Sequence, residues 1–242
     1  MDTPTAYSFH KEASRKRPMD IPRDDRFWPD HWRHPVFKEY PRLEKYTLPQ
    51  VDRELGGLKE NLYARESKRA FSSTPLTIEE VSHLLGCSAG LQEAPRTHRR
   101  TYPSGGGLYP VETYIAVTSV TGIEPGLYHY NVTHHTLEQM GDESHVTELK
   151  SGISAAWALE APLLVVLTAQ WERNFTKYGD FGYRMVLLEA GHITQNLQLV
   201  ATGLKLNNFS FVDFDEDVVE KALDIHIQNT QETPLYMTAV GK

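Results

Sequence analysis

Arginine, serine and a second arginine occupy alternate positions in the chain, at Arg65, Ser67 and Arg69. Alternate side chains of an extended segment project from one face, so these residues would present two guanidinium groups flanking a hydroxyl. Guanidinium groups offer forked donors that match phosphate oxygens, and the serine adds a short donor. The spacing therefore indicates a phosphate-binding grip, with a solvated charged face as the alternative interpretation.

A glycine-rich loop, Pro103-Ser104-Gly105-Gly106-Gly107-Leu108-Tyr109-Pro110, leads into a segment of strand-like alternation. Glycine has no Cβ and adopts positive φ at little cost, so the loop can bring backbone N–H groups close to a flat or anionic ligand. An ordinary tight turn that feeds a strand is the alternative interpretation. Together with the arginine pair, the loop favours a bound cofactor.

The composition is that of an ordinary globular chain of 242 residues, 40% hydrophobic and 24% charged, for which one domain is the default. Its 25 basic and 32 acidic residues give a formal net charge of −7, which disfavours a general nucleic-acid binder. The single cysteine, Cys87, excludes a disulfide or a cysteine-based metal site within one chain, and no metal site is expected. Without a signal peptide or an apolar run near the ~20 residues of a membrane span, we expect a cytoplasmic protein that does not bind membranes.

Residues 1–50 differ in composition from the rest, because seven of the fourteen prolines fall there. Proline is excluded from helix interiors and central strands, so neither element is expected in this segment. Several aromatic side chains are too many for a solvated tail, among them Phe27, Trp28, Trp32, Phe37 and Tyr40. We therefore expect an extended arm over residues 1–50 that wraps the domain formed by residues 51–242, or a partner subunit.

The domain combines helical and strand patterns. A capping box of Thr77 and Glu80 begins a helix, and a continuous apolar run over 162–168 is typical of a central strand buried on both faces. Residues 182–204 form the longest helical pattern, apolar nearly all round, which places it centrally in the fold or in a subunit interface. Further strands are expected at 111–120, 126–131, 136–140, 208–212 and 235–240, and helices at 51–62, 146–153 and 216–223, which makes an α+β fold.

Seven short motifs follow one another along the chain. They are Arg65-x-Ser67-x-Arg69 with Phe71, the helix from Thr77, the loop Pro103–Pro110, Gly126-Leu127-Tyr128-His129-Tyr130, Lys177-Tyr178-Gly179, Tyr183-Arg184 and Leu188-Glu189-Ala190-Gly191-His192. In this order they resemble the SagB-type dehydrogenases, the branch of the FMN-dependent nitroreductase superfamily found in azole-forming peptide biosynthesis. The resemblance covers almost the whole chain, including Phe9-His10-Lys11 and Phe37-Lys38-Glu39-Tyr40-Pro41 of the arm.

The resemblance implies an α+β sandwich in which helices flank a nitroreductase-like mixed sheet. It also implies an extensive homodimer with FMN at the subunit interface. The positions that match the residues holding the FMN phosphate and ribityl chain are Arg65, Ser67 and Arg69. Those that match the loop beside the isoalloxazine ring are Pro103, Ser104, Gly105 and Gly106.

Lys177 and Tyr178 match the pair that azoline oxidases use for proton abstraction. Oxidation of a thiazoline or oxazoline to an azole removes one carbon-bound proton and one hydride, which the flavin accepts. A lysine is a useful base only where burial lowers its pKa, and a lysine that faces solvent is the alternative interpretation. The resemblance thus implies a dehydrogenase of a modified peptide or a small amino-acid-derived heterocycle, working in the setting of a cyclodehydratase complex.

The chain departs from the family pattern after the long helix. Relatives usually carry Gly-Leu-Gly and a later Gly-x-Phe, where this chain has Lys205-Leu206-Asn207 and Val212-Asp213-Phe214. The missing glycines put backbone contacts to the flavin in question and keep open a flavin-less scaffold subunit of a peptide-modifying complex. An NAD(P)H-dependent reductase of the nitroreductase type is the other alternative, although such an enzyme would need no base at Lys177.

Overall fold

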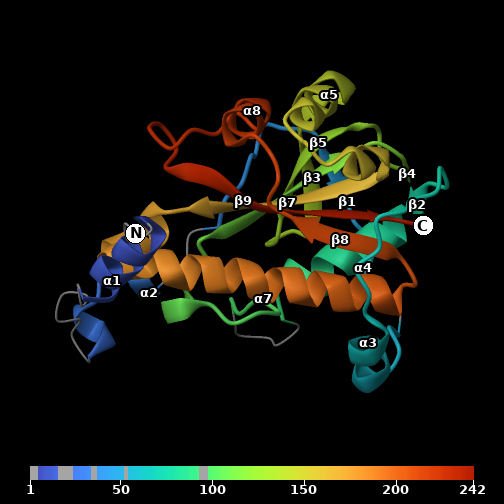
Figure 1. Ribbon diagram of the computed structural model, residues 1–242. Coiled ribbons are helices and arrows are strands. Elements are labelled where there is room, and N and C mark those ends of the chain that lie inside the picture. Colours follow the sequence, from blue (N-terminus) through green and yellow to red (C-terminus); the bar gives the residue numbers. More distant parts are fainter. Residues whose placement is uncertain (1–4, 16–23, 34–36, 52–53, 93–97) are drawn as a thin grey trace.

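The computed structural model describes residues 5–15, 24–33, 37–51, 54–92 and 98–242 (Figure 1). Seven strands form one sheet in the order β1-β6-β5-β3-β7-β9-β8, and every neighbouring pair is antiparallel. The bounds are β1 Lys45–Thr47, β3 Val111–Val117, β5 Gly126–Asn131, β6 Thr136–Asp142, β7 Leu163–Gln170, β8 Asn207–Phe211 and β9 Glu232–Gly241. A separate parallel pair joins β2 (Leu76–Thr77) to β4 (Val120–Thr121).

The strand β7 lies in the interior of the sheet, between β3 and β9. Because side chains of a strand alternate between faces, Leu163, Val165 and Leu167 enter one hydrophobic core. Leu164 and Val166 enter the second core, on the other face of the sheet. This two-sided burial confirms the prediction made from the continuous apolar run.

Helices cover both faces of the sheet, which gives three layers (Figure 1). On one face α4 (Ile78–Ala89) packs against α7 (Gly182–Gly203), and both contribute to the larger core. On the other face α5 (Glu143–Ser151) packs against α8 (Glu216–Ala222) over the smaller core. The predicted α+β fold is therefore confirmed.

Local signals placed several element boundaries correctly. The Thr77 hydroxyl accepts a hydrogen bond from Glu80 N at 3.2 Å, and the Glu80 carboxylate accepts one from Thr77 N at 2.8 Å, which completes the capping box of α4. Strands β5 and β6, which were expected at 126–131 and 136–140, pair antiparallel as a hairpin. The helix expected over 51–62 begins later than predicted and forms α3, Leu58–Ala64.

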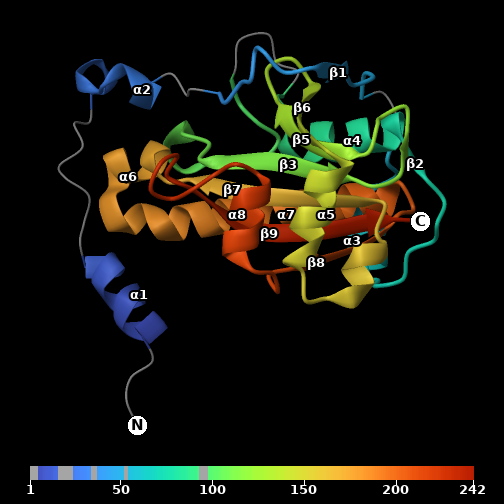
Figure 2. The same ribbon diagram turned by 90° about the horizontal axis from the view of Figure 1, so that it is seen from above.

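The N-terminal arm contains helices, so the expectation of a segment without them was wrong. The helix α1 spans Thr5–Arg15, and a short helix, α2, spans Asp30–Arg33 (Figure 2). Proline disrupts a helix only in its interior, and no proline occurs between positions 4 and 18. The arm also supplies β1, the edge strand beside β6. It packs on the domain in part, since the Phe9 ring lies edge-on to Tyr183 with centroids 5.0 Å apart.

Among the described residues, no helix combines the length and the apolar character that a membrane span requires.

A buried ion pair fastens the arm to the sheet. The Lys38 ammonium lies 2.5 Å from the Glu232 carboxylate, whose side chain is fully buried on β9. The same carboxylate accepts hydrogen bonds from the hydroxyls of Tyr114 at 2.8 Å and Thr168 at 2.6 Å. Burying a carboxylate is costly unless a cation and hydrogen-bond donors surround it. Because Lys38 of the arm provides the cation, the attachment of the arm and the stability of the sheet are coupled.

Replacing Lys38 by methionine removes the cation while leaving Glu232 buried. We expect Lys38→Met to lower the free energy of unfolding by about 3–5 kcal/mol in urea denaturation. Adding Glu232→Gln should recover much of that loss, because the uncompensated charge is then gone. The control is Lys68→Met, whose partner Glu66 lies 4.0 Å away with both side chains at least half exposed, and which should cost less than about 1 kcal/mol. Equal losses in the two single variants would contradict this account.

Candidate active site

The Lys177 side chain is buried near the end of the short helix α6, Glu172–Tyr178. Only 3% of the residue is exposed, and its Nζ has no hydrogen-bond partner among the described residues. The nearest features are aromatic faces, with the Trp28 ring centroid 3.8 Å from Nζ and the Trp32 centroid 5.3 Å away. Burial lowers the pKa of Lys177. The lysine therefore does not face solvent, and its pKa is shifted in the direction that a general base requires.

The glycine loop packs directly on Tyr178 and on the first turn of α7. A Cβ built on Gly106 would lie 2.4 Å from the Tyr178 hydroxyl oxygen, and one on Gly105 would lie 2.0 Å from Met185 Cε. Gly106 also has φ of +71°, a conformation that favours glycine. The structure thus brings together two of the predicted groups, the loop and the Lys177-Tyr178 pair.

The Ser104 hydroxyl fixes the loop by accepting a hydrogen bond from Tyr109 N at 2.9 Å. A cavity of about 820 Å³ lies beside the loop, and its lining includes Pro103, Ser104 and Gly107. Of the predicted loop residues, Pro103 and Ser104 therefore border open space in which a flat ligand could be held, whereas Gly105 and Gly106 do not line this cavity.

The third predicted group lies elsewhere in the chain. Arg65 directly follows α3, and its Nη1 lies 3.4 Å from the Ser67 hydroxyl, so these two share a face as predicted. The Arg69 guanidinium stacks on the Phe209 ring at 3.8 Å from its centroid. No carboxylate pairs with Arg65 or Arg69 within the part of the chain that the structure describes. Both cations remain available to an anion.

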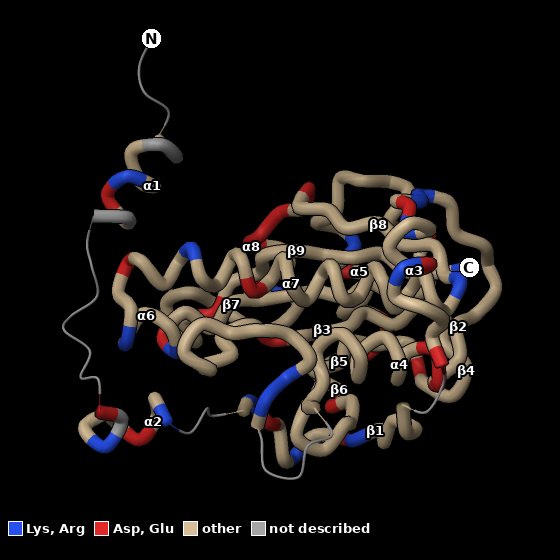
Figure 3. The backbone as a smooth tube through the Cα atoms, turned by 90° about the horizontal axis from the view of Figure 1, so that it is seen from below, with Lys and Arg blue, Asp and Glu red and all other residues tan. Residues whose placement is uncertain are grey.

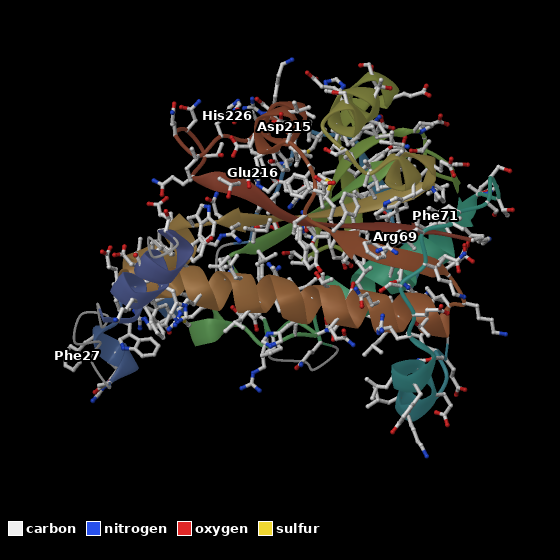
Figure 4. All side chains as sticks on the ribbon, in the orientation of Figure 1. Phe27, Arg69, Phe71, Asp215, Glu216 and His226 are labelled. Atoms are coloured by element: carbon white, nitrogen blue, oxygen red, sulfur yellow. The ribbon has the colours of Figure 1, made fainter. Side chains whose placement is uncertain are left out.

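The helix α7 separates this grip from the glycine loop. Met185, in the first turn of α7, touches the loop, whereas a Cβ on Gly203, the last residue, would meet Leu55 O and Asn61 next to α3. At 1.5 Å per residue, the distance from Met185 to Gly203 is about 27 Å. Figure 4 shows Arg69 and Phe27, the neighbour of Trp28, toward opposite ends of α7. One chain therefore does not bring the grip and the loop together.

The lysine at one of the missing glycine positions has the backbone conformation that glycine usually adopts there. Lys205, at the first position of the expected Gly-Leu-Gly, has φ of +62°. The Asn207 amide donates to Ala70 O at 2.9 Å, and Lys68 N donates to Asn208 O at 3.0 Å, so the turn holds the grip segment. The left-handed turn that glycine usually makes is formed here by lysine at a cost of roughly 1–2 kcal/mol.

Sequence reasoning assigned no role to Arg173 or to Glu189. Arg173, one turn before Lys177, forms an ion pair with the buried Glu112 at 2.6 Å and donates to Tyr109 O at 2.9 Å, which ties α6 to the glycine loop. Glu189 of α7 is 2% exposed, and burial raises its pKa to about 7. A charged residue on an otherwise apolar helical stripe was the available signal for Glu189, but nothing local in the sequence marks Arg173.

Comparison with protein families gives one match over most of the chain. Residues 62–242 match the model of the nitroreductase family. The Methanocaldococcus jannaschii protein MJ1384, which carries a nitroreductase name, is 34% identical over 186 residues, covering 76% of this chain and 90% of that protein.

Two further relatives have names that refer to peptide maturation. The trifolitoxin-processing protein TfxB of Rhizobium leguminosarum bv. trifolii is 33% identical over 62% of this chain, and the microcin B17-processing protein McbC of Escherichia coli is 31% identical over 62%. The matches cover 43% of TfxB and 57% of McbC, so this chain corresponds to about half of either protein.

Solved structures share the fold. A nitroreductase-named protein of Anabaena variabilis superposes with a TM-score of 0.74 at 27% identity, over 86% of this chain and 43% of that one. A chain of the E. coli microcin synthetase McbBCD complex with truncated pro-MccB17 gives 0.65 at 22% identity, over 98% and 91%. A Desulfovibrio desulfuricans relative in complex with FMN gives 0.54 at 14%, over 77% and 86%.

The contact between Gly106 and Tyr178 can be tested with a matched pair of glycines. Gly106→Ala combines positive φ with an overlap on the tyrosine, whereas Gly107→Ala meets positive φ alone, because no atom lies within 4 Å of its Cβ position. We expect Gly107→Ala to cost about 1–2 kcal/mol of unfolding free energy. Gly106→Ala should cost about 1–3 kcal/mol more, as overpacking does.

The second expectation concerns coupling between the two residues. In a double-mutant cycle measured by urea unfolding, Tyr178→Phe should recover part of the Gly106→Ala loss, since it removes the nearest atom. Additive losses, or equal losses at the two glycines, would show that the loop does not rest on Tyr178.

Proposed function

The chain belongs to the nitroreductase family, and on that premise we propose that it is an FMN-dependent dehydrogenase of the SagB type. Its substrate is a thiazoline, an oxazoline or a similar ring in a modified peptide or a small amino-acid-derived molecule, which it oxidises to the azole. TfxB and McbC, both named for the processing of peptide products, support this placement within the family. The family membership alone fits a reductase equally well, so the proposal depends on the site.

The observation that carries the proposal is the buried amine of Lys177, which has no hydrogen-bond partner in the described part of the chain and lies close to Tyr178 and the glycine loop. A dehydrogenase must take a proton from carbon, and a lysine does so only in its neutral form. Burial favours that form. An NAD(P)H-fed reductase requires no such base, so the burial of this lysine favours the dehydrogenase.

The residues present fit FMN. Arg65, Ser67 and Arg69 would hold its phosphate, because two guanidinium groups without carboxylate partners offer charge-assisted hydrogen bonds. The ring system would lie in the cavity beside Pro103, Ser104 and Gly107, and Gly105 and Gly106 would let the loop pack closely on Met185 and Tyr178. FMN, when bound, supplies a two-electron acceptor for the hydride.

The proposed homodimer follows from the separation of these two groups. FMN is too short to reach from Arg65 to the glycine loop along α7, so the grip of one chain must meet the loop of its copy. The outer face of α7 suits such a contact: Leu187 and Leu188 are 42% and 64% exposed, and no atom lies within 4 Å of a Cβ on Gly191. Figure 3 shows α7 as almost uncharged along its length.

In this proposal different residues of the chain accept the proton, orient the reacting groups and hold α6 in place. Lys177 accepts the carbon-bound proton at Nζ, and the Tyr178 hydroxyl, which faces the loop, orients the lysine or the substrate. Arg173 holds α6 against the loop through Tyr109 O. The arm covers the site and keeps water from the amine. We further propose that the protein works beside a cyclodehydratase, since the McbBCD structure contains an McbC-like fold together with a bound precursor peptide.

Lys177→Ala tests the assignment directly. We expect the variant to keep FMN but to lose about 10²–10⁴ of the rate. The measurement is bleaching of the bound flavin after anaerobic mixing with a synthetic peptide that carries one thiazoline. Because burial lowers the pKa of Lys177, the parental rate should rise with pH and level off below the usual lysine range. Lys221→Ala, a change at a 72% exposed side chain, is the control and should leave the rate unchanged.

Each alternative has its own signature in the same experiment. Bleaching of Lys177→Ala at the parental rate would remove Lys177 from the mechanism. Turnover that requires added NAD(P)H would identify a reductase. A purified protein that releases no FMN on denaturation would favour the scaffold subunit.

A further inference from the structure

The N-terminal arm closes over Lys177 with two tryptophans. Trp28 precedes α2 and Trp32 lies within it, about 150 residues before the lysine in the chain. Their ring centroids lie 3.8 Å and 5.3 Å from Lys177 Nζ, and the two rings meet edge to face at 6.5 Å. Trp32 is itself buried, with 9% of the residue exposed. The amine therefore ends between indole faces, with Tyr178 as the third ring at 5.5 Å.

The rings of Trp28, Trp32 and Tyr178 form an aromatic cage around the Lys177 amine. Among the described residues, the charged groups near this cage pair with one another and not with Lys177. Asp30 of α2 pairs with Arg33, Arg184 of α7 hydrogen-bonds to His10 of α1, and Arg173 of α6 pairs with Glu112. Further titratable groups on the elements around Lys177 are His31, which lies edge-on to Trp32, Glu172 at the start of α6, Asp180 just after it, and Lys11 and Glu12 of α1. Within the part of the chain that the structure describes, none of these forms an ion pair with the Lys177 amine. Its protonation is therefore governed by the rings and by its burial.

Two effects of the rings oppose each other. An indole face attracts an ammonium, which favours the charged form. The same rings remove the ammonium from water without offering a hydrogen-bond acceptor, which favours the neutral form. Loss of hydration is the larger effect for an ammonium with no acceptor, and the pKa of Lys177 is accordingly lowered by burial.

We propose that Trp28 and Trp32 are positioning residues for Lys177: the arm places two indole rings over the amine, which shield it from water and fix its position. The inference rests on the proposed role of Lys177 and deepens it. It makes residues 28–32 part of the active site. A chain in which this segment lifts off would keep its flavin grip and its glycine loop but would present an ordinary protonated lysine.

The experiment is competitive acetylation of the full chain with acetic anhydride across a pH series, followed by mass spectrometry of the Lys177 peptide. Lys221, with a 72% exposed side chain, is the internal reference. We expect Trp28→Ala to raise the labelling midpoint of Lys177 by about one pH unit or more, toward the ordinary lysine value. Trp28→Phe, which keeps an aromatic face, should shift it less. Phe27→Ala, the adjacent residue that is 73% exposed, is the matched control and should not shift it.

A second readout is the pH profile of turnover. The rise of the rate with pH should move upward by the same amount in Trp28→Ala, so that the loss seen near neutrality is recovered at higher pH. A general structural defect would lower the rate at every pH without moving the profile. Labelling midpoints within 0.3 units of the parent in both Trp28→Ala and Trp32→Ala would overturn the inference.

Labelling needs no substrate, so it separates this inference from the proposed function. If the labelling midpoint shifts in the tryptophan variants while Lys177→Ala is fully active, the positioning role of the tryptophans is supported and the catalytic role of Lys177 is refuted. If the midpoint does not shift while Lys177→Ala is inactive, the catalytic role of Lys177 is supported and the positioning role of the tryptophans is refuted.

Discussion

The length of α7 is the constraint on which the proposed site depends. The helix has 22 residues, and packing against α4 and the sheet keeps it straight and in place. The glycine loop packs on the first turn of α7, close to Tyr178, and the segment that precedes the arginine grip packs on its last turn. Because a packed helix cannot shorten, in the proposed dimer each chain would contribute two half-sites, one to each of two flavins. A two-fold axis near Gly191, close to the middle of α7, would join complementary halves.

Much of this architecture could be predicted from short-range patterns. The capping box of Thr77 and Glu80, the apolar run of β7 and the stripe of α7 each report their structure within a few residues, and the structure confirms all three. The alternate spacing of Arg65 and Ser67 likewise placed both side chains on one face. These predictions succeeded because local backbone geometry decides them. Proline counting failed for α1, because composition over 50 residues does not say where a proline-free stretch lies.

The rest depends on contacts between distant parts of the chain. No pattern near Lys177 shows that Trp28 and Trp32 cover it, and none near Arg65 gives its distance from the glycine loop. The two motifs are about 40 residues apart in sequence, whereas in the fold they lie toward opposite ends of α7. The missing glycine suggested that the turn after α7 had changed, but Lys205 makes the same left-handed turn. Residue identity there does not determine backbone conformation, since the surrounding hydrogen bonds impose it.

Subunit complementation tests the central claim, that each site combines the grip of one chain with the base of its copy. One variant carries Arg65→Ala and Arg69→Ala, the other carries Lys177→Ala, and the two are mixed in equal amounts under conditions that allow subunit exchange. Random pairing makes half of the dimers hybrid, each with one intact site, so the mixture should recover about a quarter of the parental activity although neither variant is active alone. A mixture that is no more active than its separate components after verified exchange would contradict the account.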